Sequence, residues 1–246
     1  PYYGQYASSN GIAYKYHTRQ LSYNYQQLLN YKKSFGSHNI EAMLGHESYR
    51  YKYYYLYASK SNMFDPNNPE LIGAILDGSA NSYTKDYNTE GYFGRIQYDF
   101  NEKYFVSGSY RRDASSRFHP DNRWGNFGSV GLAWLINKEN FMSNVSWIDM
   151  LKFKASYGIQ GNDNLGNYYA YADQYSVTNS NGDFAVSFSY KGNKDITWET
   201  SYAFNTGFDF ELFGNRLNGT VEYFNRKTVD LLYNQPVPIS MGYATI

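Results

Sequence analysis

Residues 107–137 read S-G-S-Y-R-R-D-A-S-S-R-F-H-P-D-N-R-W-G-N-F-G-S-V-G-L-A-W-L-I-N, and they contain two alternating segments around a polar one. The alternation entering this stretch places four residues on one side: Tyr104, Val106, Gly108 and Tyr110. The alternation leaving it does the same with Val130, Leu132, Trp134 and Ile136. A period of two is typical of half-buried β-strands. The pattern predicts two strands joined by a polar loop over residues 113–123.

The same unit recurs along the chain. Alternation is clearest over residues 92–100, 151–160 and 200–212, and about eight strong strands are predicted in all. Tight turns are expected at 36–37, 101–102 and 214–215, and a medium connection with a short helix at 138–150. Long loops are expected at 60–88, 113–123 and 161–197, the last with its own hairpin (168–177 with 184–190). A second short helix is expected at 71–76.

The connections therefore alternate between short and long. Outer-membrane β-barrels have short turns on the periplasmic side and long loops outside, whereas a soluble sandwich has no reason to sort its loops. Aromatic residues near strand ends fit a girdle at the membrane interface: Tyr31, Phe35, Phe100, Tyr104, Phe210 and Phe213. The predicted fold class is all-β, an antiparallel transmembrane β-barrel.

Composition narrows the function classes. The 246 residues include 22 basic and 22 acidic side chains, so the basic excess expected of a nucleic-acid-binding protein is absent. Cysteine is absent, which excludes disulfides and thiolate metal sites. The sequence contains no apolar run of about 18 residues, so no transmembrane helix is predicted. The 30 tyrosines suit surfaces that are apolar and wet at once.

Both ends look like cuts through a longer chain. The sequence opens at Pro1 without a signal peptide and stops at Ile246 without a terminal strand pattern. A sheet that spans lipid cannot leave an edge unpaired. Eight strands could close alone, but the ends favour an arc of a larger barrel. Residues 1–246 are therefore expected to form part of a single barrel domain.

Five ordered segments carry a family resemblance. They are R-R-D-A-S-S-R-F-H-P-D-N-R-W-G (111–125), S-V-G-L-A-W-L-I-N-K-E-N-F-M (129–142), L-K-F-K-A-S-Y-G-I-Q-G-N (151–162), D-I-T-W-E-T-S (195–201) and the N-R-L hairpin ending in N-R-K-T-V-D-L-L (225–232). The chain resembles the SusC/RagA-type TonB-dependent transporters of Bacteroidetes outer membranes. It departs from the family pattern at Ala114, His119 and Gly128, where Gly, Gly and Pro are expected, and these changes affect loop shape.

The resemblance implies a multi-pass protein of the bacterial outer membrane with a 22-stranded barrel. It also implies a plug domain inside the barrel, a SusD-like surface lipoprotein as partner, and energy supplied through TonB. The plug, the TonB-contacting segment and the final strands are not in this chain. The expected substrate is a bulky nutrient, an oligosaccharide or a peptide.

Catalytic and metal sites are not expected, and neither is a cofactor. His38 and His46 share a strand face with Ile40, whereas Glu41 and Glu47 lie on the opposite face, so the four side chains cannot converge on a metal. Ser115, Ser116 and His119 are close in sequence, but no residue pattern would orient a catalytic base there. We expect no enzyme activity.

The candidate contact residues lie in two loops. Four could face a substrate or the lipoprotein: Arg112, Arg117, Phe118 and Trp124. The favoured alternative is structural, with pairing among five charged residues that would fix the loop and the strand ends: Arg111, Arg112, Asp113, Asp121 and Arg123. Five tyrosines of the longest loop offer amphipathic contact area: Tyr168, Tyr169, Tyr171, Tyr175 and Tyr190. They could equally pack against neighbouring loops.

Two function classes follow from these observations. The leading one is a nutrient importer that works with a lipoprotein partner. The alternative is a barrel that transports nothing and serves as a surface anchor, adhesin or assembly scaffold. A plug domain upstream of Pro1 would favour the nutrient importer over the surface anchor.

Overall fold

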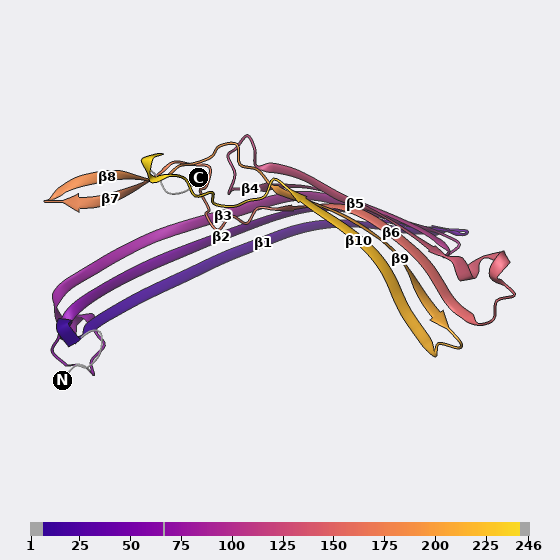
Figure 1. Cartoon of the computed structure of the whole chain (residues 1–246), viewed down its shortest axis with the longest axis horizontal. Coiled ribbons are helices and arrows are strands. Elements are labelled where there is room, and N and C mark those ends of the chain that lie inside the picture. The colour runs from indigo at the N-terminus through magenta and orange to yellow at the C-terminus, as the bar shows by residue number, and fades with distance from the viewer. Residues whose placement is uncertain (1–6, 66, 242–246) are drawn as a thin grey trace. The chain divides into compact units, whose positions relative to one another are not determined.

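The computed structural model describes residues 7–65 and 67–241, and these are organised almost entirely as antiparallel strands (Figure 1). Eight strands form one sheet in the order β1-β2-β3-β4-β5-β6-β9-β10, while β7 and β8 pair separately. The strands are β1 (Ile12–Phe35), β2 (His38–Met63), β3 (Ala74–Phe100), β4 (Tyr104–Ser115), β5 (Trp124–Leu135), β6 (Ile148–Asn162), β7 (Gln174–Ser180), β8 (Asp183–Tyr190), β9 (Glu199–Leu212) and β10 (Leu217–Val229). The all-β prediction is confirmed. No described helix is long and apolar enough to cross a membrane.

The chain divides into two compact units. One comprises Pro1–Asn24 and Tyr49–Asn88, and the other comprises Tyr25–Ser48 and Thr89–Ile246. The strands β1, β2 and β3 contribute residues to both units, and each of these strands is 24 to 27 residues long. A strand needs only about 9–11 residues to cross a bilayer, so these three strands are more than twice as long as a membrane span requires.

The first unit has a small core where β1 begins, β2 ends and β3 begins. Ala13, Met63 and Ala74 are buried together, with Leu71 packed against them. Backbone N–H groups of Asn62 and Met63 donate to the carbonyls of Gly11 and Asn10 at 3.1 and 3.0 Å, which holds the beginning of β1 beside the end of β2.

The predicted loop over residues 60–88 is wrong, because the connection between β2 and β3 covers only 64–73. The turn-like residues Asp77-Gly78-Ser79 lie within β3. There Ser79 N–H donates to Ser59 Oγ at 3.0 Å, and Gly78 lies so close to Ser59 that an added Cβ would be 2.7 Å from its carbonyl oxygen. Pairing with β2 therefore overrides the turn composition. The helix expected at 71–76 is a single 3-10 turn, Leu71–Gly73, preceding β3.

In the second unit, apolar residues of neighbouring strands pair with one another, in agreement with the alternation in the sequence. Val106 pairs with Leu132, which pairs with Ala155, and Phe153 pairs with Phe208, which pairs with Val221. All lie on one face, and Ile96, Val106, Leu132, Phe208 and Val221 remain exposed there although they are apolar. An extended exposed apolar face of this kind marks contact with a membrane or with another protein.

Tight turns occur where the sequence predicted them. Asn101 and Glu102 have φ values of 56° and 51°, the left-handed pair of a type I′ turn, and the Lys103 N–H donates to the Phe100 carbonyl at 3.0 Å. Residues 213–216 form a longer turn, in which Phe213, Gly214 and Asn215 have φ values of 59°, 66° and 63° and the Arg216 N–H donates to the Leu212 carbonyl at 3.1 Å. The medium connection 136–147 holds two 3-10 turns, η3 (Ile136–Lys138) and η4 (Asn140–Met142), in place of the expected helix. The other long connections are 116–123 and 163–198, the latter carrying the predicted hairpin as β7 and β8.

Between the two 3-10 turns, Glu139 ties the turn end of the sheet together. Its carboxylate accepts hydrogen bonds from the Tyr104 hydroxyl, from Trp134 Nε1 at 3.0 Å and from Lys103 Nζ at 3.1 Å. The Tyr104 hydrogen bond is the main cause that lowers the pKa of Glu139. Rings stack along the same end, with centroids 6.5 Å apart for Phe100 and Tyr104 and 6.3 Å apart for Tyr104 and Trp134.

Trp134 and Trp124 mark the two ends of β5 on its apolar face. Ten residues separate them, which corresponds to roughly 33 Å along a strand. With the usual tilt of barrel strands, that length spans about 25 Å of height, the thickness of the apolar band of an outer-membrane barrel. The connections 116–123 and 163–198 lie at the Trp124 end, and the turns 101–103 and 213–216 lie at the Trp134 end together with the medium connection 136–147.

Candidate functional site

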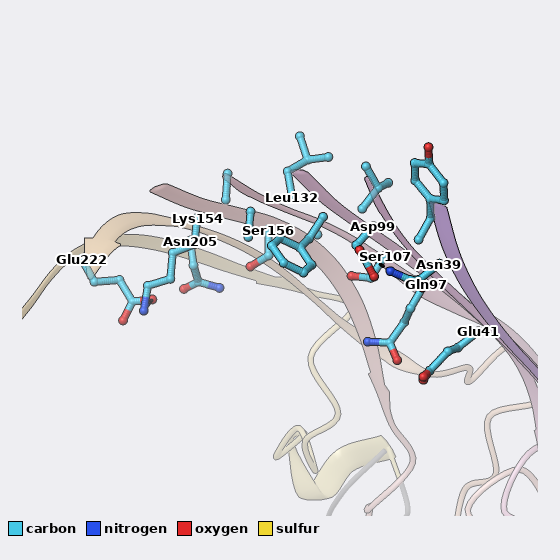
Figure 2. A pocket seen from close by; sticks show the side chains of 16 residues that line it. Asn39, Glu41, Gln97, Asp99, Ser107, Leu132, Lys154, Ser156, Asn205 and Glu222 are labelled. Atoms are coloured by element: carbon cyan, nitrogen blue, oxygen red, sulfur yellow. Dashed lines mark hydrogen bonds and ion pairs between the residues drawn. The ribbon is translucent and has the colours of Figure 1, made fainter. Parts of the chain in front are cut away.

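The second unit has a polar concave face opposite its apolar convex face. Figure 2 shows Leu132 pointing away from the side on which Gln97, Lys154, Asn205 and Glu222 lie. These polar side chains line a hollow of about 450 Å³ together with Asn39, Glu41, Asp99, Ser107 and Ser156. A sheet that is apolar outside and polar inside is the arrangement of a water-filled transmembrane barrel.

Charges on the concave face are paired across strands. Lys154 Nζ lies 2.9 Å from Asp209 Oδ1 and 3.7 Å from Glu222 Oε1, and Lys152 lies 3.9 Å from Asp209. Thr220 Oγ1 also donates to Asp209 at 2.9 Å. These contacts join β6, β9 and β10 on the side away from the apolar band, so they stiffen the wall without exposing charge to lipid.

A second hollow, of about 850 Å³, lies further along the concave face toward the long connections. Its polar lining combines the hydroxyl and amide side chains of Ser107, Ser109, Ser129, Ser156, Gln160, Asn162, Ser201 and Asn205 with four charged ones, Arg111, Asp113, Glu199 and Arg226. At its margin Arg111 bridges Glu47 at 3.2 Å and Asp113 at 2.6 Å, and its guanidinium lies 5.1 Å from the Phe93 ring centre. Hydroxyl and amide groups of this kind hydrogen-bond to sugar hydroxyls or peptide groups.

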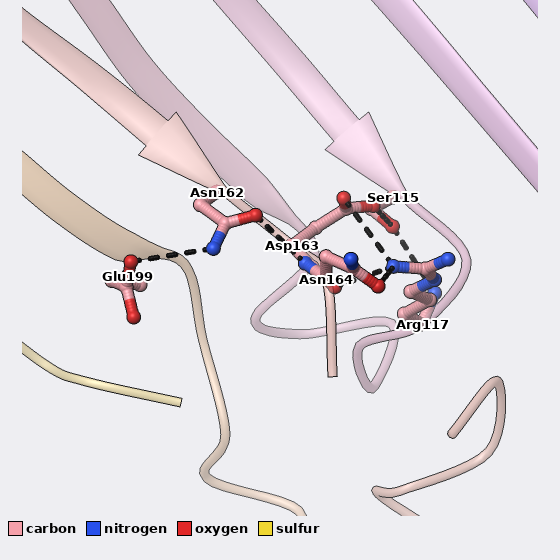
Figure 3. A network of polar contacts seen from close by, with 6 residues as sticks. All are labelled: Ser115, Arg117, Asn162, Asp163, Asn164 and Glu199. Carbon is pink, nitrogen blue, oxygen red and sulfur yellow. Dashed lines mark hydrogen bonds and ion pairs between the residues drawn. The ribbon is translucent and has the colours of Figure 1, made fainter. Parts of the chain in front are cut away.

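The connection 116–123 is fixed by a polar network with the start of connection 163–198 (Figure 3). Ser115 Oγ donates to Asp163 Oδ2 at 2.6 Å. Arg117 Nη1 donates to the Asp163 carbonyl and to Asn164 Oδ1, both at 3.0 Å, and its guanidinium lies 5.1 Å from the Tyr168 ring centre. These partners of Arg117 lie outside the loop, whereas the structural interpretation expected charged residues within the loop to pair with one another.

Phe118 and Trp198 form the apolar centre of the same cluster. Phe118 is 0% exposed and Trp198 is 9% exposed, and their ring centroids are 5.4 Å apart. Trp198 also contacts Phe127 at 5.2 Å and donates from Nε1 to the Arg123 carbonyl at 2.9 Å. A ring without exposed surface cannot touch a ligand, so the structure corrects the expectation for Phe118 and assigns it to packing.

Arg112 and Trp124 lie on the convex face, away from the polar wall. The Arg112 guanidinium lies 5.1 Å from the Trp124 ring centre, and Trp124 stacks with Tyr92 at 6.2 Å. Arg112 pairs with Tyr92 across β4 and β3. Because strand residues alternate between faces, the two side chains cannot contact a molecule inside the concave face. Whether they contact a substrate or the lipoprotein from the convex face stays a prediction.

The five candidate tyrosines do not converge on one site. Tyr168 packs on Arg117, and Tyr171 approaches the ring of His119 at 6.0 Å. Tyr169 is partly exposed beside them. Tyr175 and Tyr190 belong to β7 and β8, and burial raises the pKa of the Tyr190 phenol. Whether any of them contacts a ligand or partner stays a prediction.

The sequence analysis missed the exposed apolar face of the β7–β8 hairpin. Cross-strand pairing places Tyr175 opposite Phe188, and Val177 opposite Val186. Phe184 lies on the same face and is 90% exposed. The signal was present as alternation in Tyr175-Ser176-Val177 and Phe184-Ala185-Val186, but alternation does not say whether a face is covered.

The histidines show no metal site or catalytic arrangement. Among residues 7–65 and 67–241, no group of three or more metal-ligating side chains comes together. His46 stacks on Tyr92 at 4.7 Å, with Nε2 3.4 Å from a Glu90 oxygen but not aligned for a hydrogen bond. His119 Nδ1 lies 3.3 Å from Asp121 Oδ2, whereas Ser115 donates its hydrogen bond to Asp163.

Comparison with known proteins agrees with this architecture. Residues 1–245 match the family described as TonB dependent receptor-like, beta-barrel. TonB-dependent receptor P39 of Formosa agariphila is 34% identical over 90% of this chain and 22% of its own length. TonB-dependent receptor SusC of Bacteroides thetaiotaomicron is 31% identical over 98% of this chain and 24% of its own length. The chain thus spans about a quarter of the curated relatives it matches.

Solved structures give the same result. The structure of the RagAB peptide transporter aligns with a TM-score of 0.88 and 28% identity, over 94% of this chain and 26% of that one. The RagAB peptide importer in its open-open state aligns with a TM-score of 0.83. The resemblance to SusC and RagA is therefore confirmed, and the chain belongs to the family of TonB-dependent receptor-like β-barrels.

Proposed function

We propose that this chain is an arc of the wall of an outer-membrane transporter that imports a bulky nutrient, an oligosaccharide or a peptide. The observation that carries the proposal is the pair of opposed faces, one apolar and exposed, the other polar with an ion-pair network around Lys154 and Asp209. A wall of this kind separates lipid from an aqueous path. Its neutral hydroxyl and amide groups suit a ligand that is itself rich in hydroxyl or amide groups.

The chain contributes eight strands, and both edge strands, β1 and β10, need neighbours in a membrane. We propose that the whole protein supplies these neighbours, in a barrel of about 22 strands by analogy with the family. A plug inside the barrel and a segment that contacts TonB would complete the transporter. SusC of Bacteroides thetaiotaomicron and the RagAB transporters support this assignment.

The β7–β8 hairpin is the proposed contact for a SusD-like surface lipoprotein. An isolated two-stranded hairpin is marginally stable in water, and this one exposes Tyr175, Val177, Phe184 and Val186 on one face. Aromatic side chains are enriched in protein interfaces because they bury much area. A covering partner would both shield this face and hold the hairpin in place.

An excision tests the partner proposal in the full-length protein. Gln174 pairs with Tyr190, so residues 175–189 can be replaced by Gly-Ser while Asp173 and Lys191 keep their contact. The double variant Phe184→Ser with Val186→Ser removes the apolar face alone. The matched control is Ser187→Thr, which changes a polar position on the opposite face of the same hairpin. We expect co-purification of a lipoprotein in mild detergent to fall with the first two and to persist with the control.

Growth separates transport from the anchor alternative. Cells that lack the full-length protein should fail to grow on one polymeric or peptide nutrient that the parent strain uses. The excision variant should fold, as judged by resistance to SDS, and should grow poorly on the same nutrient. Normal growth on every such nutrient, with no lipoprotein recovered, would replace the transporter by the surface anchor.

A further inference from the structure

The convex face contains a groove that crosses three strands within the apolar band. It has a volume of about 860 Å³, and its walls are apolar side chains of β2, β3 and β4: Ala42, Leu44, Tyr92, Ile96 and Tyr110. Gly94 and Gly108 form its floor, and the register places Gly94 beside Tyr110 and Gly108 beside Ile96. Each glycine thus faces a large side chain on the neighbouring strand, and the two glycines leave a channel as wide as one side chain.

The positively charged Arg112 lies at the end of this groove that is nearer to Trp124. Arg112 lies directly opposite Tyr92 in the β3–β4 pairing, and its guanidinium stacks on Trp124 at 5.1 Å. Among the residues that the structure describes, Arg112 forms no ion pair, whereas Arg111, which points to the concave face, bridges Glu47 and Asp113. A stacked guanidinium keeps its in-plane N–H donors available for an anion.

The groups around Arg112 suit a sugar as well as an anion. Tyr92 and Trp124 stack with centroids 6.2 Å apart and offer flat faces, and Glu90 accepts a hydrogen bond from the Tyr92 hydroxyl at 2.7 Å. His46 stacks on Tyr92 on its other side. Glu90 therefore interacts with Tyr92 and His46 and leaves the charge of Arg112 uncompensated.

We propose that this groove is a specific site for one phosphorylated glycolipid of the outer leaflet. One acyl chain lies over Gly94 and Gly108, between Leu44, Ile96 and Tyr110, and a headgroup phosphate binds Arg112. An apolar channel leads to one uncompensated cation, Arg112, which lies beside Trp124. This arrangement matches an amphiphile with an anionic headgroup. The proposal rests on the membrane placement proposed above.

The groove can be filled without disturbing the strands. A Cβ added at Gly108 would meet Ile96 Cγ2 at 3.8 Å and the Ser129 carbonyl at 4.0 Å, which are ordinary contacts. Gly108→Leu therefore places a side chain where the acyl chain would lie. By contrast, a Cβ at Gly128 would lie 2.6 Å from the Ser109 carbonyl oxygen, so substitution there would strain the backbone. Val221→Leu, on the same convex face but on β10, is the matched control.

The experiment uses the full-length protein, stripped of lipid in detergent and incubated with diphosphoryl lipid A, with phosphatidylglycerol in a second arm. Native mass spectrometry counts the lipids retained per barrel, and SDS resistance reports folding separately. We expect one retained lipid A for the parent protein and Val221→Leu. Loss of a charged hydrogen bond should reduce retention about tenfold to a hundredfold in Arg112→Gln, and Arg112→Lys should keep most of it. Gly108→Leu should also lose the lipid.

Four results would overturn the proposal. The first is equal retention in Gly108→Leu and Val221→Leu, and the second is a preference for phosphatidylglycerol. The third is a lipid-free dimer that Gly108→Leu dissociates, which would give the groove to a second copy of the chain. The fourth is the absence of lipid A binding. A folded, SDS-resistant protein that transports normally but binds no lipid A would reject the lipid site and leave the proposed function intact.

Discussion

Ile96 and Gln97 are neighbours in β3 that face opposite sides of the sheet, so they test the membrane assignment at the scale of single residues. Ile96 is exposed on the apolar convex face, and Gln97 lines the concave hollow. We expect Ile96→Arg to lower the free energy of folding into lipid vesicles by about 2–4 kcal/mol, because a charge near the bilayer midplane loses its hydration. Gln97→Arg should cost far less. Urea titrations of the full-length protein in vesicles measure both, and equal penalties would contradict the assignment.

Phe118 tests whether the loop over residues 116–123 is a packed structure. Its ring is fully buried against Trp198, so Phe118→Ala leaves a cavity, and such truncations cost about 3–5 kcal/mol. We expect faster amide hydrogen exchange across 116–123 and 195–198, with the barrel strands unchanged. Phe184→Ala is the control, because that ring is exposed. Unchanged exchange in Phe118→Ala would mean that the polar network around Asp163 holds the loop alone.

Sequence reasoning located these positions unevenly. The faces of Ile96, Leu132 and Phe208 followed from alternation, because one face must meet lipid and the other water. The burial of Phe118 did not follow, because it depends on Trp198, which is eighty residues away in the sequence and gives no local periodicity. Arg112 was also assigned to a loop, whereas in the structure β4 continues past it to Ser115.

At the scale of elements, the base of the β7–β8 hairpin depends on one acidic side chain. Asp173 accepts hydrogen bonds from Lys191 Nζ at 3.0 Å and from the Gly192 N–H at 2.9 Å, and these hold the pKa of Asp173 below its usual value of 3.8. A carboxyl with a lowered pKa in the folded state stabilises that state above its unfolded pKa. This stabilisation is lost as the pH falls through the folded pKa.

The hairpin should therefore loosen in acid, below about pH 3.8. We expect amide protection of Gly192 and of residues 174–190 to fall between neutral pH and pH 3 in the parent protein. Asp173→Asn should show the lower protection already at neutral pH, with little further change in acid. Hydrogen exchange followed by mass spectrometry measures both, and a pH response that survives in Asp173→Asn would assign it to other groups.

The elements that sequence reasoning placed well are those with one lipid-facing side. Strands β4, β5, β6, β9 and β10 and the turns at 101–102 and 214–215 were predicted to within a few residues, because alternation and left-handed turn residues are local signals. The outer parts of β2 and β3 were taken for a loop. There both faces meet water, so no alternation is imposed, and hydrogen bonds such as Ser79 to Ser59 decide the structure.

At the scale of the whole molecule, the sorting of connections predicts which end of the barrel faces the cell exterior. The connections 64–73, 116–123 and 163–198 lie at one kind of strand end, and the turns 36–37, 101–103 and 213–216 lie at the other together with the medium connection 136–147. Outer-membrane barrels place long loops outside, so Asn68, Asp121 and Asn179 should be extracellular and Asn215 periplasmic. The described chain lacks cysteine, which makes each of these positions a clean labelling site once the remainder of the full-length protein is also free of exposed cysteine.

Single cysteines at the four positions, in whole cells of the native host, turn this topology into a measurement. A membrane-impermeant maleimide should label Asn68→Cys, Asp121→Cys and Asn179→Cys and should spare Asn215→Cys. After the outer membrane is permeabilised, Asn215→Cys should label as well, which shows that it was shielded by the membrane and not by the protein. The covering lipoprotein adds a further expectation, because the hairpin that carries Asn179 is its proposed contact. Labelling of Asn179→Cys should therefore be slower in the parent strain than in a strain without the lipoprotein, whereas Asn68→Cys should label at the same rate in both. Labelling of Asn215→Cys in intact cells, with protection of the other three, would invert the barrel in the membrane.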